Sequence, residues 1–141
     1  MVYVDTSVMA ALLLNEPRSA DVARWYGACK NELVSAVWCV TEFASALGIK
    51  RRTGQIAEAE AQAAWQRFER LCANDLHLLP IEPSTFHRAA VLTLDAATAL
   101  RAGDSLHLAA ALDAKAKSMA TLDGVLAKNA RRMKLRLAVR D

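Results

Sequence analysis

The sequence has 141 residues, of which 54% are hydrophobic and 23% charged, and its formal net charge is +3 at pH 7. This balance excludes a disordered chain and favours one domain, residues 1–141, with a sizeable core. No apolar run approaches the roughly 18 residues that a membrane-spanning helix needs.

Short β-prone runs alternate with helical patterns along the chain. Strands are predicted at residues 2–4, 32–35, 77–81, 118–122 and 135–139. Helices are predicted at residues 7–14, 19–30, 36–52, 55–74, 84–93, 104–117 and 124–133, with Ser19 as the cap of the second. The strands are apolar on both sides of the pleat, which favours an α/β fold with a parallel sheet covered by helices on both faces.

Four of these apolar segments each contain a single carboxylate. Asp5 follows the first strand, Asp123 follows the "SMATL" strand, Asp104 heads a helix, and Glu42 lies inside one. Carboxylates are rarely buried without a partner. Ligands bind at the carboxyl ends of parallel strands, near helix N-termini, so the acids at these junctions are expected to converge on one crevice.

Two of the four acids have simpler interpretations. Asp104 precedes a helical run and is suited to cap it, because Asp accepts hydrogen bonds from the free N–H groups of a first turn. Glu42 lies in one of two roughly opposite stripes of its helix, and both stripes contain large apolar residues, which predicts a helix buried on most sides. Its own helix offers no obvious cation there, so Arg51, Arg101 or another base is the alternative partner.

Electrostatics distinguishes these interpretations from a shared site. Two carboxylates about 4 Å apart repel by roughly 4 kcal/mol at an effective dielectric constant near 20. Four of them in one crevice therefore need a cation. Oxygen ligands without a histidine or cysteine cluster favour Mg²⁺ or Mn²⁺, and such an ion activates water for phosphodiester hydrolysis.

The acidic segments resemble, in order and spacing, the four motifs of the PIN domain, and more narrowly the VapC-type ribonuclease toxins of type II toxin–antitoxin pairs. The segments are "VYVDTSVMAALLL", the Glu42 helix, "LRAGDSLHLAAAL" and "ATLDGVLAKNA". The resemblance covers nearly the whole chain. It implies a three-layer α/β/α fold with a central parallel sheet of about five strands. It also implies a cytoplasmic, metal-dependent endoribonuclease toxin that forms a homodimer and is blocked by a VapB-like antitoxin.

The resemblance also assigns residues. It implies that Asp5, Glu42, Asp104 and Asp123 bind one or two Mg²⁺ or Mn²⁺ ions and are the catalytic residues. Ser7 and Thr121 match the hydroxyls that orient carboxylates or water. We interpret His107 as a packing residue, because a metal bound by oxygens does not require it.

Positive charge is concentrated near the C-terminal end. Residues 115–141 hold eight basic and two acidic side chains, which indicates a polyanionic partner. We expect RNA phosphates to be contacted by basic residues that lie near the acidic segments in sequence. These residues are Lys50, Arg51, Arg52, Arg101, Lys128, Arg131 and Arg132.

Other functions have less support. The sequence contains neither GxGxxG nor GxxxxGK[ST], the phosphate-binding patterns of nucleotide-binding proteins. A metal-free ribonuclease would use histidine as acid and base, but none of the three histidines sits at a strand end with an obvious partner. The open alternatives are a solitary PIN nuclease without a toxin role and a catalytically silent PIN-like interaction module. The three cysteines lack zinc-ligand spacing and are expected to be buried free thiols in a reducing cytosol.

Overall fold

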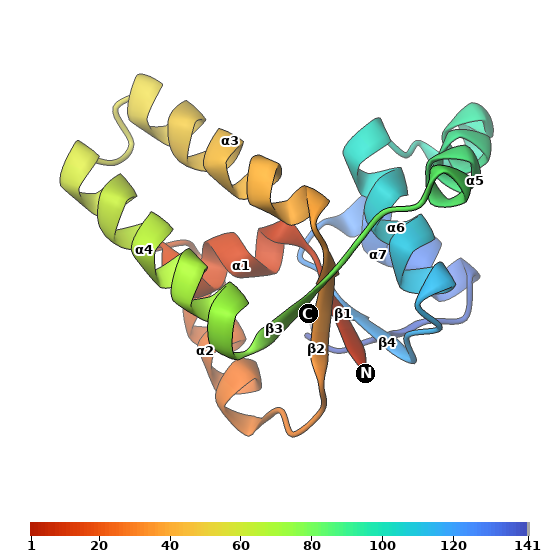
Figure 1. Cartoon of the computed structure of the whole chain (residues 1–141), viewed down its shortest axis with the longest axis horizontal. Coiled ribbons are helices and arrows are strands. Elements are labelled where there is room, and N and C mark those ends of the chain that lie inside the picture. The colour runs from red at the N-terminus through yellow and green to blue at the C-terminus, as the bar shows by residue number, and fades with distance from the viewer. Residues whose placement is uncertain (141) are drawn as a thin grey trace.

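The centre of the protein is a sheet of five parallel strands in the order β3-β2-β1-β4-β5. The structure, a computed structural model, describes residues 1–140 (Figure 1). The strands are β1 (Val2–Val4), β2 (Leu33–Ala36), β3 (Leu76–Leu79), β4 (Ser118–Ala120) and β5 (Arg136–Leu137). The predicted parallel sheet of five strands is confirmed.

Helices cover both faces of this sheet and make the fold a three-layer α/β/α arrangement. On one face lie α1 (Thr6–Leu13), α2 (Ser19–Ala28), α3 (Trp38–Arg52) and α4 (Glu58–Asn74). On the other lie α5 (Pro83–Leu94), the short 3-10 helix η1 (Ala96–Thr98), α6 (Ala102–Asp113) and α7 (Gly124–Arg132). Within residues 1–140, no helix combines the length and apolar character needed to cross a membrane.

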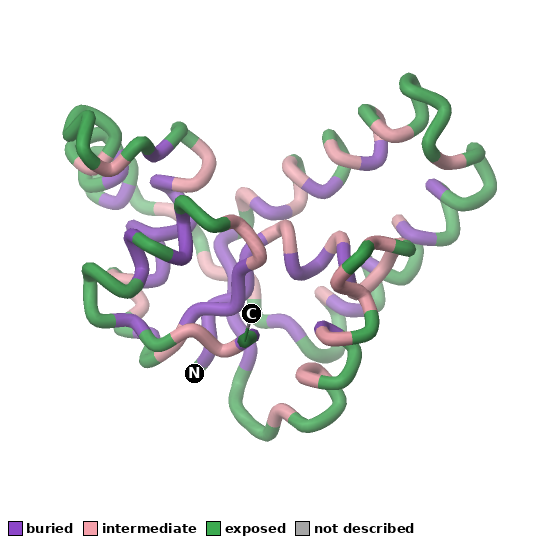
Figure 2. The backbone as a smooth tube through the Cα atoms, turned by 180° about the vertical axis from the view of Figure 1, so that it is seen from behind, coloured by how far each residue is buried: buried purple, intermediate pink, exposed green. Residues whose placement is uncertain are grey.

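Alternation along β1 divides the core between the two faces. Val2 and Val4 pack with the helices of the first face, whereas Tyr3 packs with α6 and α7 on the second. All three side chains are buried, because β1 is the middle strand and is covered on both sides. The burial map accordingly shows the strands as the buried centre of the molecule (Figure 2).

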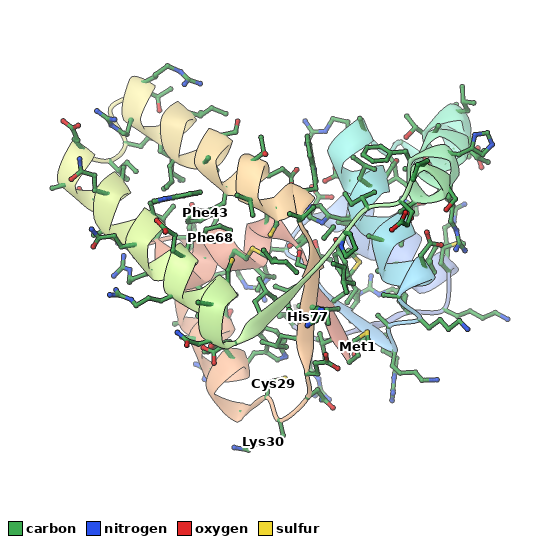
Figure 3. All side chains as sticks on the ribbon, in the orientation of Figure 1. Met1, Cys29, Lys30, Phe43, Phe68 and His77 are labelled. Carbon is green, nitrogen blue, oxygen red and sulfur yellow. The ribbon has the colours of Figure 1, made fainter. Side chains whose placement is uncertain are left out.

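Helices α3 and α4 form an antiparallel pair that projects from the sheet (Figure 1). Phe43 and Phe68 stack between them, with ring centroids 4.5 Å apart (Figure 3). Only one stripe of α3 is buried, namely Cys39, Phe43 and Leu47. The prediction that this helix is buried on most sides is therefore wrong, because the projecting pair leaves its outer side in contact with solvent.

Several predicted boundaries and caps also differ from the structure. Helix α6 begins at Ala102, so Asp104 is its third residue and Arg101 occupies the cap position. The cap of α2 is Arg18, and the Ser19 hydroxyl instead joins the preceding loop by accepting from the Glu16 N–H and donating to the Leu14 carbonyl. Both cap predictions are wrong, because Ser19 and Asp104 lie inside their helices and not at the position that precedes the first helical residue.

The fold has a topological switch point between β1 and β4. The chain leaves β1 into α1 on one face of the sheet and leaves β4 into α7 on the other. Loops that diverge in this way leave a crevice at the carboxyl ends of the two strands, which is where open α/β sheets bind ligands.

Candidate active site

Asp5 lies at this switch point, directly after β1, and only 3% of its surface is exposed. Its Oδ1 accepts hydrogen bonds from the Ser7 hydroxyl (2.6 Å) and the Val8 backbone N–H (3.1 Å), and Asp5 thereby caps α1. Its Oδ2 accepts from the Thr121 hydroxyl. Burial raises the pKa of Asp5, although the charge of His107 and these hydrogen bonds oppose the rise. A cation near such a buried carboxylate would stabilise its charged form, so Asp5 is a candidate cation ligand.

Ser7 and Thr121 connect the two loops around Asp5. The Ser7 hydroxyl, which donates to Asp5, accepts from the Leu122 backbone N–H at 2.9 Å. The Thr121 hydroxyl, which also donates to Asp5, accepts from the Asp123 backbone N–H at 3.1 Å. The two hydroxyls therefore hold the Asp5 carboxylate in a fixed orientation relative to the β4–α7 loop.

Asp104 and Asp123 lie at the starts of α6 and α7. Asp123 caps α7, because its Oδ1 accepts from the Leu126 N–H at 2.7 Å. The Asp104 side chain is 22% exposed. Desolvation raises the pKa of Asp104, and the negative charges of Asp123 and Asp5 raise it further, against the charges of Arg101 and His107. These three acids, distant in sequence, therefore interact electrostatically at one edge of the sheet.

Glu42 reaches the same region from the first turns of α3. Its Oε1 accepts from the Thr6 hydroxyl at 2.6 Å and is also hydrogen-bonded to Nε2 of His107. Burial would raise the pKa of Glu42, but the hydrogen bond and charge of His107, together with Thr6, lower it overall. The partner of Glu42 is thus a histidine from α6 and not one of the arginines considered from the sequence.

A second contact between Glu42 and α6 is made at Gly103. A Cβ atom placed on Gly103 would lie 2.8 Å from Oε2 of Glu42 and 3.3 Å from Nε1 of Trp38. Glu42 is therefore packed against the residue that precedes Asp104. Within residues 1–140, however, no three acidic, histidine or cysteine side chains lie close enough together to hold a metal ion.

The seven basic residues singled out in the sequence occupy different places. Arg101 lies nearest the acids, with its Nε 3.9 Å from Oδ2 of Asp104, and its side chain is 86% exposed. On α3, Lys50 forms an ion pair with Glu16 at 2.7 Å and Arg51 one with Glu58 at 3.7 Å. The end of α3 that carries these residues points away from the sheet (Figure 1). The remaining candidates are exposed, and they are Arg52 on α3 and Lys128, Arg131 and Arg132 on α7.

Sequence reasoning missed the contact between His107 and Glu42. His107 is 2% exposed, as a packing residue would be, but both of its ring nitrogens are hydrogen-bonded. Two features of the sequence indicated that such a contact was needed. Glu42 has no cation within one turn of it in its own helix, and His107 is a polar residue in an apolar helix, so each required a partner that the other could supply.

Comparison with protein-family models identifies the fold family. The PIN domain model matches residues 2–132, so the chain belongs to the PIN domain family. None of the curated protein sequences matches the chain significantly.

Solved structures share the fold at low sequence identity. VapC20 of Mycobacterium tuberculosis, described as a sarcin–ricin loop cleaving toxin, superposes with a TM-score of 0.76 at 13% identity, over 92% of this chain and 95% of that one. FitAcB of Neisseria gonorrhoeae gives a TM-score of 0.70 at 18% identity, over 97% of this chain and 96% of that one. FitAB bound to the IR36 DNA fragment gives a TM-score of 0.70 at 18% identity, over 97% of this chain and 93% of that one.

Proposed function

We propose that this chain is a metal-dependent endoribonuclease and the toxin of a toxin–antitoxin pair. The observation that carries the proposal is the environment of Asp5, a buried carboxylate whose pKa is raised, at the switch point of a PIN domain. Asp104 and Asp123 repel one another beside it. A divalent cation would relieve both the desolvation and the repulsion.

The donor set fits Mg²⁺ or Mn²⁺. Asp5, Asp104, Asp123 and Glu42 offer only oxygen, the ligand that these hard ions prefer. Each carboxylate oxygen can accept two partners, and Thr121 is the one described donor to Oδ2 of Asp5, so this oxygen retains room for a cation. When bound, such an ion lowers the pKa of water and offsets negative charge on a phosphodiester. The protein's own contribution is to hold the carboxylates in place by hydrogen bonds. Ser7 and Thr121 hold Asp5 in this way, and Thr6 and His107 hold Glu42.

The toxin role is supported by the similarity to VapC20, a toxin with the same fold. A toxin requires a partner that blocks its acids, and an Arg or Lys of an antitoxin would pair with Asp5 and Asp104. The three cysteines are free, which fits a reducing cytoplasm. The homodimer that the family resemblance implies stays a prediction.

Cleavage of RNA by the purified chain tests the proposal. Wild type is expected to cut single-stranded or loop RNA with Mg²⁺ or Mn²⁺, and excess chelator should stop it. Hydrolysis by an activated water leaves 5′-phosphate and 3′-hydroxyl ends. Asp5→Asn should lower the rate by at least 100-fold, because Asn still caps α1 but has no charge for a cation. Asp95→Asn is the matched control, since Asp95 also caps a helix by its side chain but is exposed on η1.

The same variants separate a toxin from other PIN domains in cells. Expression of wild type alone should arrest growth, and Asp5→Asn should relieve the arrest while Asp95→Asn should not. Cleavage without growth arrest would indicate a solitary PIN nuclease. If the wild type folds but neither cleaves RNA nor arrests growth, the chain is a catalytically silent PIN-like interaction module. Cleavage that persists in chelator, or 2′,3′-cyclic phosphate ends, would contradict the metal-dependent mechanism.

We also propose that Arg101 contacts an RNA phosphate, because it is the exposed cation beside Asp104. Arg101→Gln is expected to weaken RNA binding equally for different sequences. It should reduce the slope of log K against log salt by about 0.7, the value for one phosphate of a single strand. Arg70→Gln is the control, since Arg70 is exposed near the end of α4 that leads into the amino end of β3, at the opposite edge of the sheet from the acids. Fluorescence anisotropy over a salt series, without metal, measures both. Equal slopes for wild type and Arg101→Gln would contradict this assignment.

A further inference from the structure

We propose that His107 is a positioning residue, which fixes the orientation of the Glu42 carboxylate through its Nε2–H. This inference rests on the proposed function of Glu42 in the acidic site. His107 lies on the second turn of α6, three residues after Asp104, and its ring points into the protein, where it is 2% exposed. It contacts β1 through Tyr3, the start of α1 through Thr6, and α3 through Glu42.

The hydrogen bonds around His107 determine where its proton lies. The Tyr3 hydroxyl oxygen accepts from the Ala36 backbone N–H at 3.0 Å and lies 2.8 Å from Nδ1 of His107. On the other side of the ring, Nε2 faces Oε1 of Glu42, and an ionised carboxylate can only accept a hydrogen bond, so Nε2 carries a proton whether the ring is neutral or charged. When the ring is neutral, Nδ1 accepts from the Tyr3 hydroxyl. Nε2–H then donates to Oε1 of Glu42.

This arrangement makes the two oxygens of Glu42 different. Oε1 receives both donors, the Nε2–H of His107 and the Thr6 hydroxyl at 2.6 Å. Oε2 is directed to Gly103, beside Asp104. Two donors on one oxygen oppose rotation of the carboxylate about its terminal bond. The result is one oxygen fixed inward and the other placed against Gly103, the residue before Asp104.

A packing role alone does not explain this choice of residue. Burial of a polar ring is unfavourable unless its nitrogens are hydrogen-bonded, and a buried Leu or Met would fill similar space without that requirement. Histidine satisfies both the Tyr3 hydroxyl and the Glu42 carboxylate at once. Hydrogen bonds that orient metal-binding carboxylates typically change metal affinity or activity by 10–100-fold when they are removed.

Two amide substitutions at His107 distinguish the roles of its two ring nitrogens. The amide nitrogen of His107→Gln reaches approximately to Nε2 and can still donate to Glu42. The shorter side chain of His107→Asn reaches approximately to Nδ1, so it can contact Tyr3 but not Glu42. We expect His107→Gln to retain kcat within about threefold and His107→Asn to lose 10–100-fold. The KM for RNA should be unchanged in both, and the Kd for Mn²⁺, measured by calorimetry, should rise only in His107→Asn. Equal losses in the two variants would overturn the proposal and support packing.

A measurement on the folded wild type stands independently of activity. Long-range ¹H–¹⁵N correlation of the imidazole nitrogens is expected to show the neutral ring protonated on Nε2. A proton on Nδ1 would overturn the proposal, even if the variants failed to fold. If wild type neither binds Mn²⁺ nor cleaves RNA, the proposed function fails, and the positioning role fails with it even where the Nε2–H is found. If wild type does both and His107→Asn matches it, only the positioning role fails.

Discussion

Asp104→Asn is expected to melt higher than wild type in the presence of chelator, by about 3 °C for a gain of ~1 kcal/mol. The physical reason is that Asp104 is partly desolvated and repelled by Asp123 and Asp5, and both effects raise its pKa. An amide at this position carries no charge and removes both penalties. Asp104 makes no contribution as the cap of α6, since Arg101 occupies that position, so no capping hydrogen bond is lost.

Asp21 offers a matched control. It is also the third residue of its helix, α2, but it forms ion pairs with Arg18 and Arg24. Asp21→Asn should lower the melting temperature slightly, because a negative charge in the first turn favours the helix and its ion pairs are exposed. The two substitutions are chemically identical and are expected to have opposite signs, which separates repulsion in the site from a general effect of removing a carboxylate.

Metal should reverse the order for Asp104. An ion that binds only the folded state stabilises it by mass action, so wild type should gain more from Mg²⁺ or Mn²⁺ than Asp104→Asn does. Thermal unfolding of both proteins, with chelator and with millimolar metal, measures this difference. If wild type responds to neither metal and the variant melts no higher, the carboxylates do not form a shared cation site.

The pH dependence has a definite sign. Because the pKa of Asp104 is raised in the folded protein, its ionisation destabilises the fold. The stability associated with this group is fully present below its usual pKa of 3.8 and is lost as the pH rises through the higher folded value. The advantage of Asp104→Asn in chelator should therefore be seen at neutral pH and disappear below about pH 4.

The sheet was predictable because its inner strands are covered on both faces and are therefore mostly apolar, with Ser35 and Ser118 as exceptions. Residues Val2–Val4 of β1 match the predicted strand, whereas β5 is only Arg136–Leu137 of the predicted 135–139. In this edge strand, only Arg136 and Leu137 pair with β4. The exposure of α3 was not predictable, because periodicity reports which residues are apolar and does not report whether another element covers them.

The acidic residues could be selected from the sequence, but their environments could not. Charge isolation indicated Asp5 and Asp104, since each is alone in an apolar segment. The structure adds that Asp5 is a cap and Asp104 is not, a distinction that depends on where each helix begins. The bond between His107 and Glu42 joins residues 65 positions apart, and no local pattern fixes such a pair.

Gly103→Ala is expected to lower RNA cleavage by at least tenfold while leaving stability nearly unchanged. A Cβ atom at this position would lie 2.8 Å from Oε2 of Glu42, closer than side-chain carbons pack, so one of the two must move. The backbone of α6 is fixed by its helix, and Oε1 of Glu42 is held by Thr6 and His107. The carboxylate of Glu42 therefore has to turn or withdraw, and this breaks the arrangement that places Oε2 against Gly103, beside Asp104. Replacing Gly by Ala inside a helix contributes about 0.5–1 kcal/mol, which offsets the lost contacts in the free energy of unfolding.

Gly124→Ala is the matched control for this position. Gly124 lies in the first turn of α7 beside Asp123, as Gly103 lies beside Asp104, but a Cβ atom there meets nothing within 4 Å. Its activity should match wild type, so a loss confined to Gly103→Ala would assign the effect to the contact with Glu42. Gly103→Ala combined with Glu42→Asp tests the cause, because the shorter side chain removes the clash. The double variant should then lose less activity than the product of the two single losses. Full activity in Gly103→Ala would show that Glu42 has no fixed position in the reaction, and a large drop in melting temperature would show that the contact serves the fold and not the site.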